Sequence, residues 1–274
     1  MDQYKEKYGP WALITGASSG LGAEFARQLA KKGLNLIIAA RRTDRLEDLA
    51  EQLRKDQGID VRCVGVDLSV PDFLPTILKA TEDVEVGLLV NNAGYGMATD
   101  FLASDLEKEL HMFHTNCRAP LILAHEFGRQ MRRRGRGGMI FLSSMVGMWA
   151  CPWYSGYSAA KGFDMLLGES LHYELKKAGI DVLAVCPGET DTEFQPVAGV
   201  KGIMPASPVP VIRESLDSLG RRAVLVPGAL NRFFAFSLIR LWPGKLRARV
   251  MALGVRLQLR KAGRLHAIRG GTGS

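Results

Sequence analysis

Short, largely apolar runs alternate with longer amphipathic segments along most of this chain. The apolar runs occupy residues 11–15, 34–40, 61–66, 86–90, 139–142, 180–185 and 224–226. Between them, apolar residues recur at helical spacing in residues 21–32, 43–57, 72–82, 104–134 and 155–178. Apolar runs without a strict in–out alternation are typical of strands that are covered on both faces of a parallel sheet. The pattern therefore predicts strands that alternate with covering helices.

This alternation predicts the α/β class, with about seven strands in one parallel sheet. Because crossovers between parallel strands are right-handed, the helices cover both faces and give a three-layer α/β/α sandwich. The expected architecture is a Rossmann-like doubly wound sheet. In such a sheet a ligand lies at the carboxyl ends of the strands, so residues that follow a strand are the first candidates for a binding site.

A glycine-rich turn follows the first apolar run and reads Thr15-Gly16-Ala17-Ser18-Ser19-Gly20-Leu21-Gly22. Its glycines let the backbone turn tightly and approach a pyrophosphate, which the free N–H groups of the next helix then face. Glycines also fill ordinary tight turns, and that is the alternative interpretation. The position between a first strand and a first helix favours a nucleotide.

Further motifs occur in order along the chain. They are Asn91-Asn92-Ala93-Gly94, Asn116, Ser144, Tyr157-x-x-x-Lys161, and Pro187-Gly188 with Thr192 four residues later. With this set and the glycine-rich turn, the chain resembles the short-chain dehydrogenases/reductases over about residues 10–226. The resemblance implies a nicotinamide-dependent oxidoreductase. It also implies a homodimer or homotetramer that pairs through the helices near residues 104–134 and 155–178.

The resemblance also assigns residues to the cofactor. The implied cofactor-binding residues are Gly16, Ser18, Ser19, Gly20, Leu21, Arg41, Arg42, Asp67, Leu68, Asn92, Ala93, Gly94, Tyr157, Lys161, Pro187, Gly188, Thr190 and Thr192. Asp67 resembles the family's adenine-contacting aspartate, and a helix cap before Pro71 is its alternative role. Thr192 is assigned to the nicotinamide carboxamide, with Thr190 as its substitute.

Two arginines, Arg41 and Arg42, follow the second run where an NAD enzyme usually carries an acidic residue. A guanidinium binds a 2′-phosphate through charge-assisted, bidentate hydrogen bonds. NADP(H) is therefore favoured over NAD(H). The alternative is a solvated arginine pair. The glycine-rich turn lacks the basic residue that many NADP-dependent relatives place there, so NAD(H) stays open.

The resemblance implies four catalytic residues, Asn116, Ser144, Tyr157 and Lys161. A free tyrosine has a pKa near 10, and a nearby ammonium lowers it. Lys161 follows Tyr157 by four residues, so both project from one face of a helix. Ser144 would orient the substrate oxygen, although Ser143 competes for that role, and Asn116 would hold a relay water. As alternatives, Tyr157 is a surface aromatic, Ser143 and Ser144 cap the end of a strand, and Asn116 caps a turn.

The substrate predicted from these motifs is an apolar ketone or secondary alcohol, such as a 3-oxoacyl, steroid-like or xenobiotic carbonyl. Residues 193–210 should cover it and contain Phe194, Val197, Val200, Ile203 and Met204. The opposite wall would come from residues 145–154. Simple core packing of these apolar residues is the alternative. A nucleotide-sensing or scaffolding protein without catalysis is the alternative function.

Charge is distributed unevenly along the chain. The net charge is +8, but residues 221–274 hold twelve Lys/Arg and no Asp/Glu, so the rest has 24 basic and 28 acidic residues. We expect residues 1–228 to form the catalytic and cofactor-binding domain. Residues 229–274 should form a basic amphipathic helical extension, not an independent domain.

The extension combines a dense apolar segment, residues 233–242, with a helix after Pro243-Gly244. The predicted apolar stripe of this helix is Leu246, Val250, Leu253 and Leu257, flanked by Lys245, Arg249, Arg256 and Arg260. Such a helix packs on its own domain or on a partner, or it lies on an anionic membrane through residues 229–262. Nucleic-acid binding is not expected, because no recognised module is present.

Other features limit the remaining classes. The histidines form no metal-ligand pattern, so no metal site is expected. The four scattered cysteines, Cys63, Cys117, Cys151 and Cys186, are expected to be reduced, buried thiols. No signal-peptide core and no membrane-spanning run is visible. We therefore expect a cytoplasmic enzyme, with peripheral membrane association as an open alternative.

Overall fold

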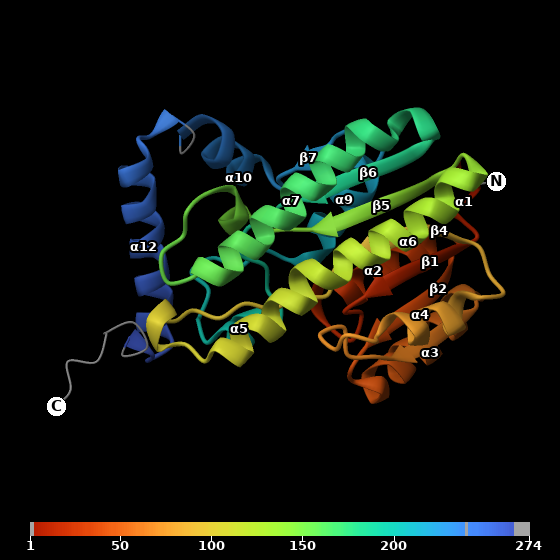
Figure 1. Ribbon diagram of the computed structural model, residues 1–274, viewed down its shortest axis with the longest axis horizontal. Helices are drawn as coiled ribbons and strands as arrows, with labels where there is room; N and C mark the ends of the chain where they lie inside the picture. Colours follow the sequence, from red (N-terminus) through yellow and green to blue (C-terminus); the bar gives the residue numbers. More distant parts are fainter. Residues whose placement is uncertain (1–2, 239–240, 266–274) are drawn as a thin grey trace.

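Seven parallel strands form one sheet in the order β3-β2-β1-β4-β5-β6-β7 (Figure 1). The computed structural model describes residues 3–238 and 241–265. The strands are β1 (Trp11–Thr15), β2 (Asn35–Ala40), β3 (Val61–Gly65), β4 (Val86–Asn91), β5 (Gly137–Leu142), β6 (Ile180–Val185) and β7 (Val224–Leu225). The predicted seven-stranded Rossmann-like sandwich is confirmed.

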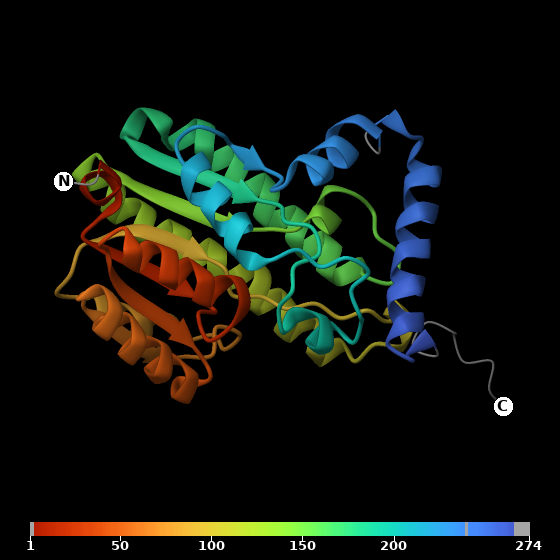
Figure 2. The ribbon, with the colours of Figure 1, turned by 180° about the vertical axis from the view of Figure 1, so that it is seen from behind.

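Helices cover both faces of the sheet (Figures 1 and 2). One face carries α2 (Gly20–Lys31), α3 (Thr43–Gln57) and α9 (Pro208–Ser218), and the other carries α4 (Leu74–Thr81), α6 (Ala119–Arg134) and α7 (Ser155–Leu175). Successive strand residues point to opposite faces, so Leu13 joins one core and Ile14 the other. This two-sided burial is why the strands read as apolar runs.

The order of the strands reverses at β1. β1 pairs with β2 on one side and with β4 on the other. After β1 the chain continues to β2 and β3 on one side of the sheet, and after β4 it continues to β5, β6 and β7 on the other side. Loops after β1 and β4 therefore diverge at the carboxyl edge and leave a crevice between them. The glycine-rich turn follows β1 and Asn92 follows β4, so the fold brings both motifs to this crevice.

Several elements go beyond the predicted order. The helices α1 (Gln3–Tyr8), α8 (Phe194–Ala198) and α9 were not predicted, and α4 begins at Leu74 rather than Asp72. The predicted helical region 104–134 consists of α5 (Leu106–Phe113), the π-helical turn η2 (His114–Arg118) and α6. The remaining short turns are η1 (Phe101–Ala103), η3 (Met145–Met148) and η4 (Lys176–Ala178), the last of which continues α7.

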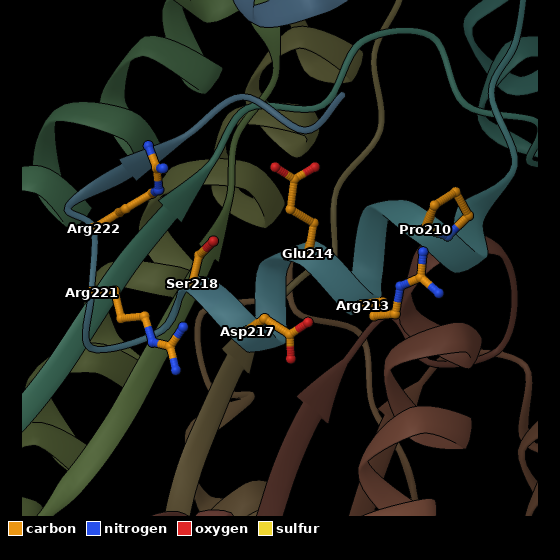
Figure 3. Close-up of a pocket in the computed structure, with 7 residues that line it drawn as sticks. All are labelled: Pro210, Arg213, Glu214, Asp217, Ser218, Arg221 and Arg222. Carbon is orange, nitrogen blue, oxygen red and sulfur yellow. The ribbon is translucent and has the colours of Figure 1, made fainter. Parts of the chain in front are cut away.

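The C-terminal extension contains α10 (Ala229–Phe233), the π-helical turn η5 (Phe234–Leu238) and α12 (Gly244–Lys261). It is joined to α9 by Glu214, which accepts hydrogen bonds from the Arg232 guanidinium and, at 2.9 Å, from the Gly228 amide. Figure 3 shows Glu214 beside Arg213, Asp217, Arg221 and Arg222, which line a surface hollow along α9. Charges of both signs alternate there, so the hollow does not present one concentrated charge to a ligand.

Helix α12 stands beyond the carboxyl edge of the sheet and packs inwards through Val255 and Leu259 (Figure 1). The predicted apolar stripe does not make this contact, because Leu246, Leu253 and Leu257 are 43%, 57% and 43% exposed. The helix therefore packs on its own domain through a different face, and the predicted stripe stays exposed in the single chain. No helix within residues 3–238 and 241–265 is both long and apolar enough to cross a membrane. Residues 239–240 and 266–274 of the predicted extension lie outside the described residues.

Candidate active site

A cavity of about 630 Å³ opens at the carboxyl ends of the strands. All the predicted cofactor-binding and catalytic residues line it, except Asn116. Residues that were not predicted also line it. Among these are Tyr95, Thr115, Glu189, Asn231 and Gln258. One cavity thus joins the glycine-rich turn at one end to Tyr157 at the other.

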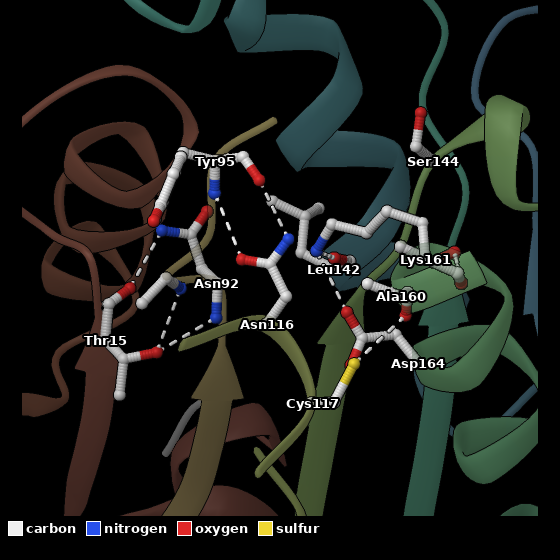
Figure 4. A network of polar contacts seen from close by, with 12 residues as sticks. Thr15, Asn92, Tyr95, Asn116, Cys117, Leu142, Ser144, Ala160, Lys161 and Asp164 are labelled. Atoms are coloured by element: carbon white, nitrogen blue, oxygen red, sulfur yellow. Dashed lines mark hydrogen bonds and ion pairs between the residues drawn. The ribbon is translucent and has the colours of Figure 1, made fainter. Parts of the chain in front are cut away.

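The glycine-rich turn is held by the segment after β4. Asn92 donates from Nδ2 to the carbonyl oxygens of Thr15 at 2.8 Å and Gly16 at 3.2 Å (Figure 4). Gly16 has φ +68°, and a Cβ atom there would lie 2.7 Å from Ala93 Cα. Ser19, at the N-cap of α2, makes no side-chain capping bond within the described structure. The turn therefore brings bare backbone and free N–H groups to the cavity, which fits a pyrophosphate.

The arginine pair after β2 lies beside this turn. Arg42 donates to Ser18 Oγ at 3.1 Å, Ser19 Oγ at 2.8 Å and Glu193 Oε2 at 2.8 Å. Glu193 also pairs with Arg45, and these hydrogen bonds lower the pKa of its carboxyl to about 2. Glu193 was predicted only as the first residue of the segment that covers the substrate, and Arg45 was not predicted as part of the site. Their pairing links residues 148 positions apart, which no local sequence pattern reveals.

Asp67 lies at the far side of the same region. Its Oδ1 accepts hydrogen bonds from the Ser69 amide at 2.9 Å and the Ser69 hydroxyl at 2.7 Å. Ser69 Oγ lies 2.7 Å from His111 Nε2, and His111 Nδ1 lies 2.8 Å from the Tyr95 hydroxyl. Burial acts to raise the pKa of Asp67, but the Ser69 hydrogen bonds and the charge on Arg41 outweigh it and lower the pKa. Asp67 thus stabilises the local turn through Ser69 and also lines the cavity.

Tyr157 and Lys161 project from α7 into the cavity, and both side chains are buried. Burial raises the pKa of Tyr157, while the charge on Lys161 and the Ser144 hydroxyl act to lower it. Lys161 Nζ donates to the Leu142 carbonyl at 2.6 Å and to Asp164 Oδ2 at 2.9 Å (Figure 4). The ammonium therefore lies on the same helix face as the phenol, as the spacing predicted.

The structure distinguishes the two serines that competed in the sequence. Ser143 is buried, and its hydroxyl donates to the Lys161 carbonyl at 2.6 Å, so it fixes α7 against β5. Ser144 is the N-cap of η3, where its hydroxyl accepts weakly from the Val146 amide at 3.4 Å. Because that contact is long, the Ser144 hydroxyl is the better placed of the two to bind a ligand in the cavity.

Asn116 lies behind the cavity wall rather than in it. Its side chain is fully buried, accepts from the Tyr95 amide at 3.1 Å and donates to the Tyr95 carbonyl at 2.8 Å (Figure 4). A Cβ atom at Gly94 would lie 3.0 Å from Asn116 Oδ1 and 3.3 Å from Lys161 Nζ. The π-helical turn η2 thus brings Asn116 close to Lys161, although its amide already has backbone partners.

Apolar side chains form the outer part of the cavity. Phe194, Val197 and Val200 line it as expected, whereas Ile203 and Met204 are exposed and do not. Met145, Val146 and Tyr154 form the opposite wall. Cys151, Tyr154 and Tyr157 also pack against Val255 and Leu259 of α12. The apolar residues therefore both line the cavity and form a small core behind it, as each alternative proposed.

The extension contributes polar residues to this wall. Gln258 of α12 donates a hydrogen bond to Glu189, which follows β6. Asn231 of α10 donates to the Pro227 carbonyl at 3.1 Å and borders Gly188. Their distance from the motifs along the chain explains why they were missed. The strong basic and apolar character of the extension was the available signal.

Metal and cysteine chemistry receive no support from the described residues. No group of three or more His, Cys, Asp or Glu side chains that could hold a metal ion occurs within them. All four cysteines are free, with Cys117, Cys151 and Cys186 buried and Cys63 half-buried. Burial raises the pKa of the three buried thiols, so they are neutral at physiological pH.

The fold, the glycine cradle and the buried tyrosine–lysine pair define the class as nicotinamide-dependent oxidoreductases. The family model for short chain dehydrogenases matches residues 10–199. A 7beta-hydroxysteroid dehydrogenase of Clostridium sardiniense is 30% identical over 233 residues, which are 84% of this chain and 89% of that protein. The chain belongs to the short-chain dehydrogenase/reductase family, and it is an enzyme acting on CH–OH and C=O groups.

Solved structures agree with this assignment. A structure of a 7beta-hydroxysteroid dehydrogenase superimposes with a TM-score of 0.85 and 27% identity, covering 92% of this chain and 99% of that one. A short-chain dehydrogenase from Sphingobium yanoikuyae in complex with NADPH gives a TM-score of 0.76 and 31% identity, covering 85% of this chain and 93% of that one. The similarity to the first structure spans most of the described chain.

Proposed function

We propose that this enzyme transfers hydride between NADP(H) and an apolar ketone or secondary alcohol, with Tyr157 as the general acid/base. The observation that carries the proposal is the single cavity that joins the glycine cradle to the buried Tyr157–Lys161 pair. When bound, the nicotinamide supplies or accepts the hydride. The residues of the chain must then orient the carbonyl and move the proton.

In the reducing direction, the Tyr157 hydroxyl donates its proton to the carbonyl oxygen of the substrate. Ser144 donates a second hydrogen bond to that oxygen and stabilises the charge that develops on it. Lys161 stabilises the phenolate that forms and would hold the ribose hydroxyls. The backbone of Asn116 would hold a water molecule. This water would link Lys161 to solvent and carry the proton between them. In the oxidising direction, the phenolate accepts the proton instead.

The preference for NADP(H) rests on Arg41 and Arg42. Arg42 and the hydroxyls of Ser18 and Ser19 form a cluster of donors at the edge of the cradle, where a ribose 2′-phosphate would lie. The NADPH complex of the Sphingobium yanoikuyae relative supports the same choice. The remaining predicted contacts are assigned as in the family: Asp67 and Leu68 to the adenine, and Thr192, with Thr190, to the carboxamide.

The substrate class rests on the apolar outer wall of the cavity. A steroid-like or 3-oxoacyl carbonyl would bury its apolar body against Phe194, Val197 and Tyr154. The hydroxysteroid-acting relative favours a bulky ring system. A purely apolar compound would leave the Gln258–Glu189 contact intact, whereas a substrate with a polar group at its far end has these side chains as partners.

The direct test is NADPH consumption with a panel of steroid, 3-oxoacyl and aryl ketones. Tyr157→Phe should lower kcat by at least about 1,000-fold, because the proton donor is lost while the cofactor contacts remain. NADPH binding, followed by its fluorescence, should stay within about threefold of the original value. Tyr173→Phe is the matched control, since Tyr173 is exposed on the same helix. Full activity of Tyr157→Phe, or no turnover of any carbonyl, would favour the nucleotide-sensing alternative.

A homodimer is the proposed assembly. Apolar side chains that are exposed in the single chain occur on α5 and α7: Leu106, Leu110, Phe113 and Leu166. Contiguous exposed apolar surface of this kind marks an interface. Light scattering should give twice the mass of one chain, or four times it for a homotetramer. Leu166→Glu should lower that mass, and a monomeric unmodified protein would refute the proposal.

Peripheral contact of a cytoplasmic enzyme with anionic lipid is the proposed role of the outer face of α12. Leu253 and Leu257 are exposed there, next to Arg249, Arg256 and Arg260. No acidic residue follows Arg221, so this face complements an anionic surface. The inner face of the same helix closes the cavity, which would place the cavity near the lipid.

Sedimentation with vesicles tests this contact. The protein should bind vesicles that contain phosphatidylserine and not vesicles of phosphatidylcholine alone. Leu253→Glu with Leu257→Glu should abolish binding, whereas Lys31→Gln with Lys55→Gln, which changes the net charge equally, should bind. If the leucine variant binds vesicles unchanged but has fewer subunits, the face contacts a second copy and the lipid proposal is wrong.

A further inference from the structure

A buried carboxylate lies beneath the proposed catalytic pair and takes no part in the chemistry described above. Asp164 follows Lys161 by one helical turn, and its Oδ2 lies 2.9 Å from Lys161 Nζ. The side chains are 3% and 5% exposed. Asp164 Oδ1 has no hydrogen-bond partner within the described residues. Lys161 therefore supplies the hydrogen bond and the charge that keep this carboxylate ionised.

The surroundings leave few other groups that change charge. The titratable groups that face this pair are Tyr157 on the same helix, Cys117 on η2 and Cys186 after β6. Tyr157 is itself faced by Cys151 and Tyr154, which precede α7. Burial raises the pKa of the thiols of Cys117 and Cys186 to about 12 and that of Cys151 to about 11. Burial also raises the pKa of the Tyr154 hydroxyl. The thiols and Tyr154 therefore remain neutral, so Tyr157 responds to two charges of opposite sign.

These two charges act on Tyr157 in opposite directions. The ammonium of Lys161 favours the phenolate, and the carboxylate of Asp164 disfavours it. In a buried site both interactions are screened less than in water. The Lys161–Asp164 pair as a whole is neutral. The pair therefore stabilises the Tyr157 phenolate much less than a lone buried lysine would.

We propose that Asp164 is a positioning residue that holds Lys161 Nζ and offsets its charge, so that Tyr157 stays a proton donor and the site favours carbonyl reduction. This inference rests on the proposed acid/base role of Tyr157. It assigns Asp164 no contact with substrate or cofactor. It makes Asp164 the residue that sets the pH at which the enzyme changes from reduction to oxidation.

Asp164→Asn tests the proposal, because it removes the charge and keeps the size. The pKa of Tyr157 should fall. The rising limb of kcat for alcohol oxidation should then move to lower pH by about 1 to 2 units. The falling limb of kcat for ketone reduction should move in the same direction. Burial raises the pKa of Asp164 itself to about 6. The unmodified enzyme should therefore approach the variant below about pH 6, where its own carboxyl is protonated.

The controls separate charge from structure. Glu169→Gln removes one carboxylate from the same helix, and its profiles should match those of the unmodified enzyme. If Asp164→Asn does not fold, Asp164→Glu decides, because it keeps the charge beside Lys161. Its limbs should stay within about 0.3 pH unit of the original, and a larger shift to lower pH would overturn the proposal.

The outcomes also separate this inference from the proposed function. Profiles of Asp164→Asn that superimpose on those of the unmodified enzyme would overturn the role of Asp164 alone. A uniform loss of kcat at every pH, without a shift of either limb, would do the same and would indicate a structural role only. Absence of turnover in the unmodified enzyme, or full turnover in Tyr157→Phe, would overturn the proposed function itself.

Discussion

Glu193 accepts a hydrogen bond from Arg42 at 2.8 Å at the edge of the cofactor cradle. The two residues lie 151 positions apart in the sequence, and both line the cavity. The proposed 2′-phosphate would bind the same guanidinium. Under the proposed function, the Glu193 carboxylate would compete with the cofactor for Arg42, and the contact would rearrange when NADPH binds.

Glu193→Gln is expected to tighten NADPH binding. The exposed ion pair contributes at most about 1 kcal/mol, so the Kd should fall by about two- to fivefold. Fluorescence titration measures this, with Glu107→Gln, on the distant helix α5, as control. The pKa of Glu193 is lowered to about 2, so the ion pair is present above that pH and lost as pH falls through it. The gain should therefore be the same at pH 6 and pH 8. Weaker NADPH binding by Glu193→Gln would contradict the competition.

Arg42→Ala should change the cofactor preference. Loss of a charged hydrogen-bond donor to a phosphate costs about 1.5–3 kcal/mol, which corresponds to a roughly 10- to 150-fold higher KM for NADPH. KM for NADH should change less than about threefold. Steady-state kinetics with both cofactors measure this, with Lys55→Ala as control. An equal rise in both KM values would mean that Arg42 supports the cradle and does not select the phosphate.

Ser144→Ala should lower the activity, whereas Ser143→Ala should lower the stability. Loss of the Ser144 hydroxyl should lower kcat by about 100- to 1,000-fold and leave Tm nearly unchanged, because it removes a donor to the reacting oxygen. Loss of the Ser143 hydroxyl removes a buried hydrogen bond to the Lys161 carbonyl and should lower the free energy of unfolding by about 1–3 kcal/mol. Kinetics and thermal unfolding on both variants measure this. The reverse result would transfer the catalytic role to Ser143.

Phe127→Ala should destabilise the protein without changing the site. Phe127 of α6 is fully buried against the sheet, and such truncations cost about 3–5 kcal/mol. Leu121→Ala, at a half-exposed position on the same helix, should cost much less. Urea unfolding gives both values. A loss below about 1 kcal/mol for Phe127→Ala would contradict the packing of α6.

Much of the fold was predictable because its causes are local. Strands buried on both faces read as apolar runs, and the order of runs and helices defines the sheet. The predicted family and enzyme class were also confirmed, by the family model that matches residues 10–199 and by the relatives. The predicted limits of α4 were less accurate, because the first turn after Pro71 packs without a side-chain cap.

The unpredicted parts depend on contacts between distant segments. Arg42 lies 151 positions from Glu193, and Gln258 of α12 lies 69 positions from Glu189. The stripe of α12 was predicted from spacing alone. Spacing identifies an apolar face but does not show whether that face packs against the domain. Here Val255 and Leu259 pack against the domain instead of the predicted stripe. The proposed effect of the Asp164 carboxylate on Lys161 and Tyr157 depends on the burial of Asp164, and the sequence does not show that burial.

Gln258 and Asn231 bring the last part of the chain into the cavity wall, while the glycine cradle and the arginine pair come from its first fifth. Under the proposed function, the two ends of the chain therefore control different properties. Substitutions of Gln258 on α12 would change which molecules enter, whereas the glycine cradle and the arginine pair, which would hold the cofactor, are untouched. Selectivity and reactivity can thus diverge independently between descendants of one ancestral gene.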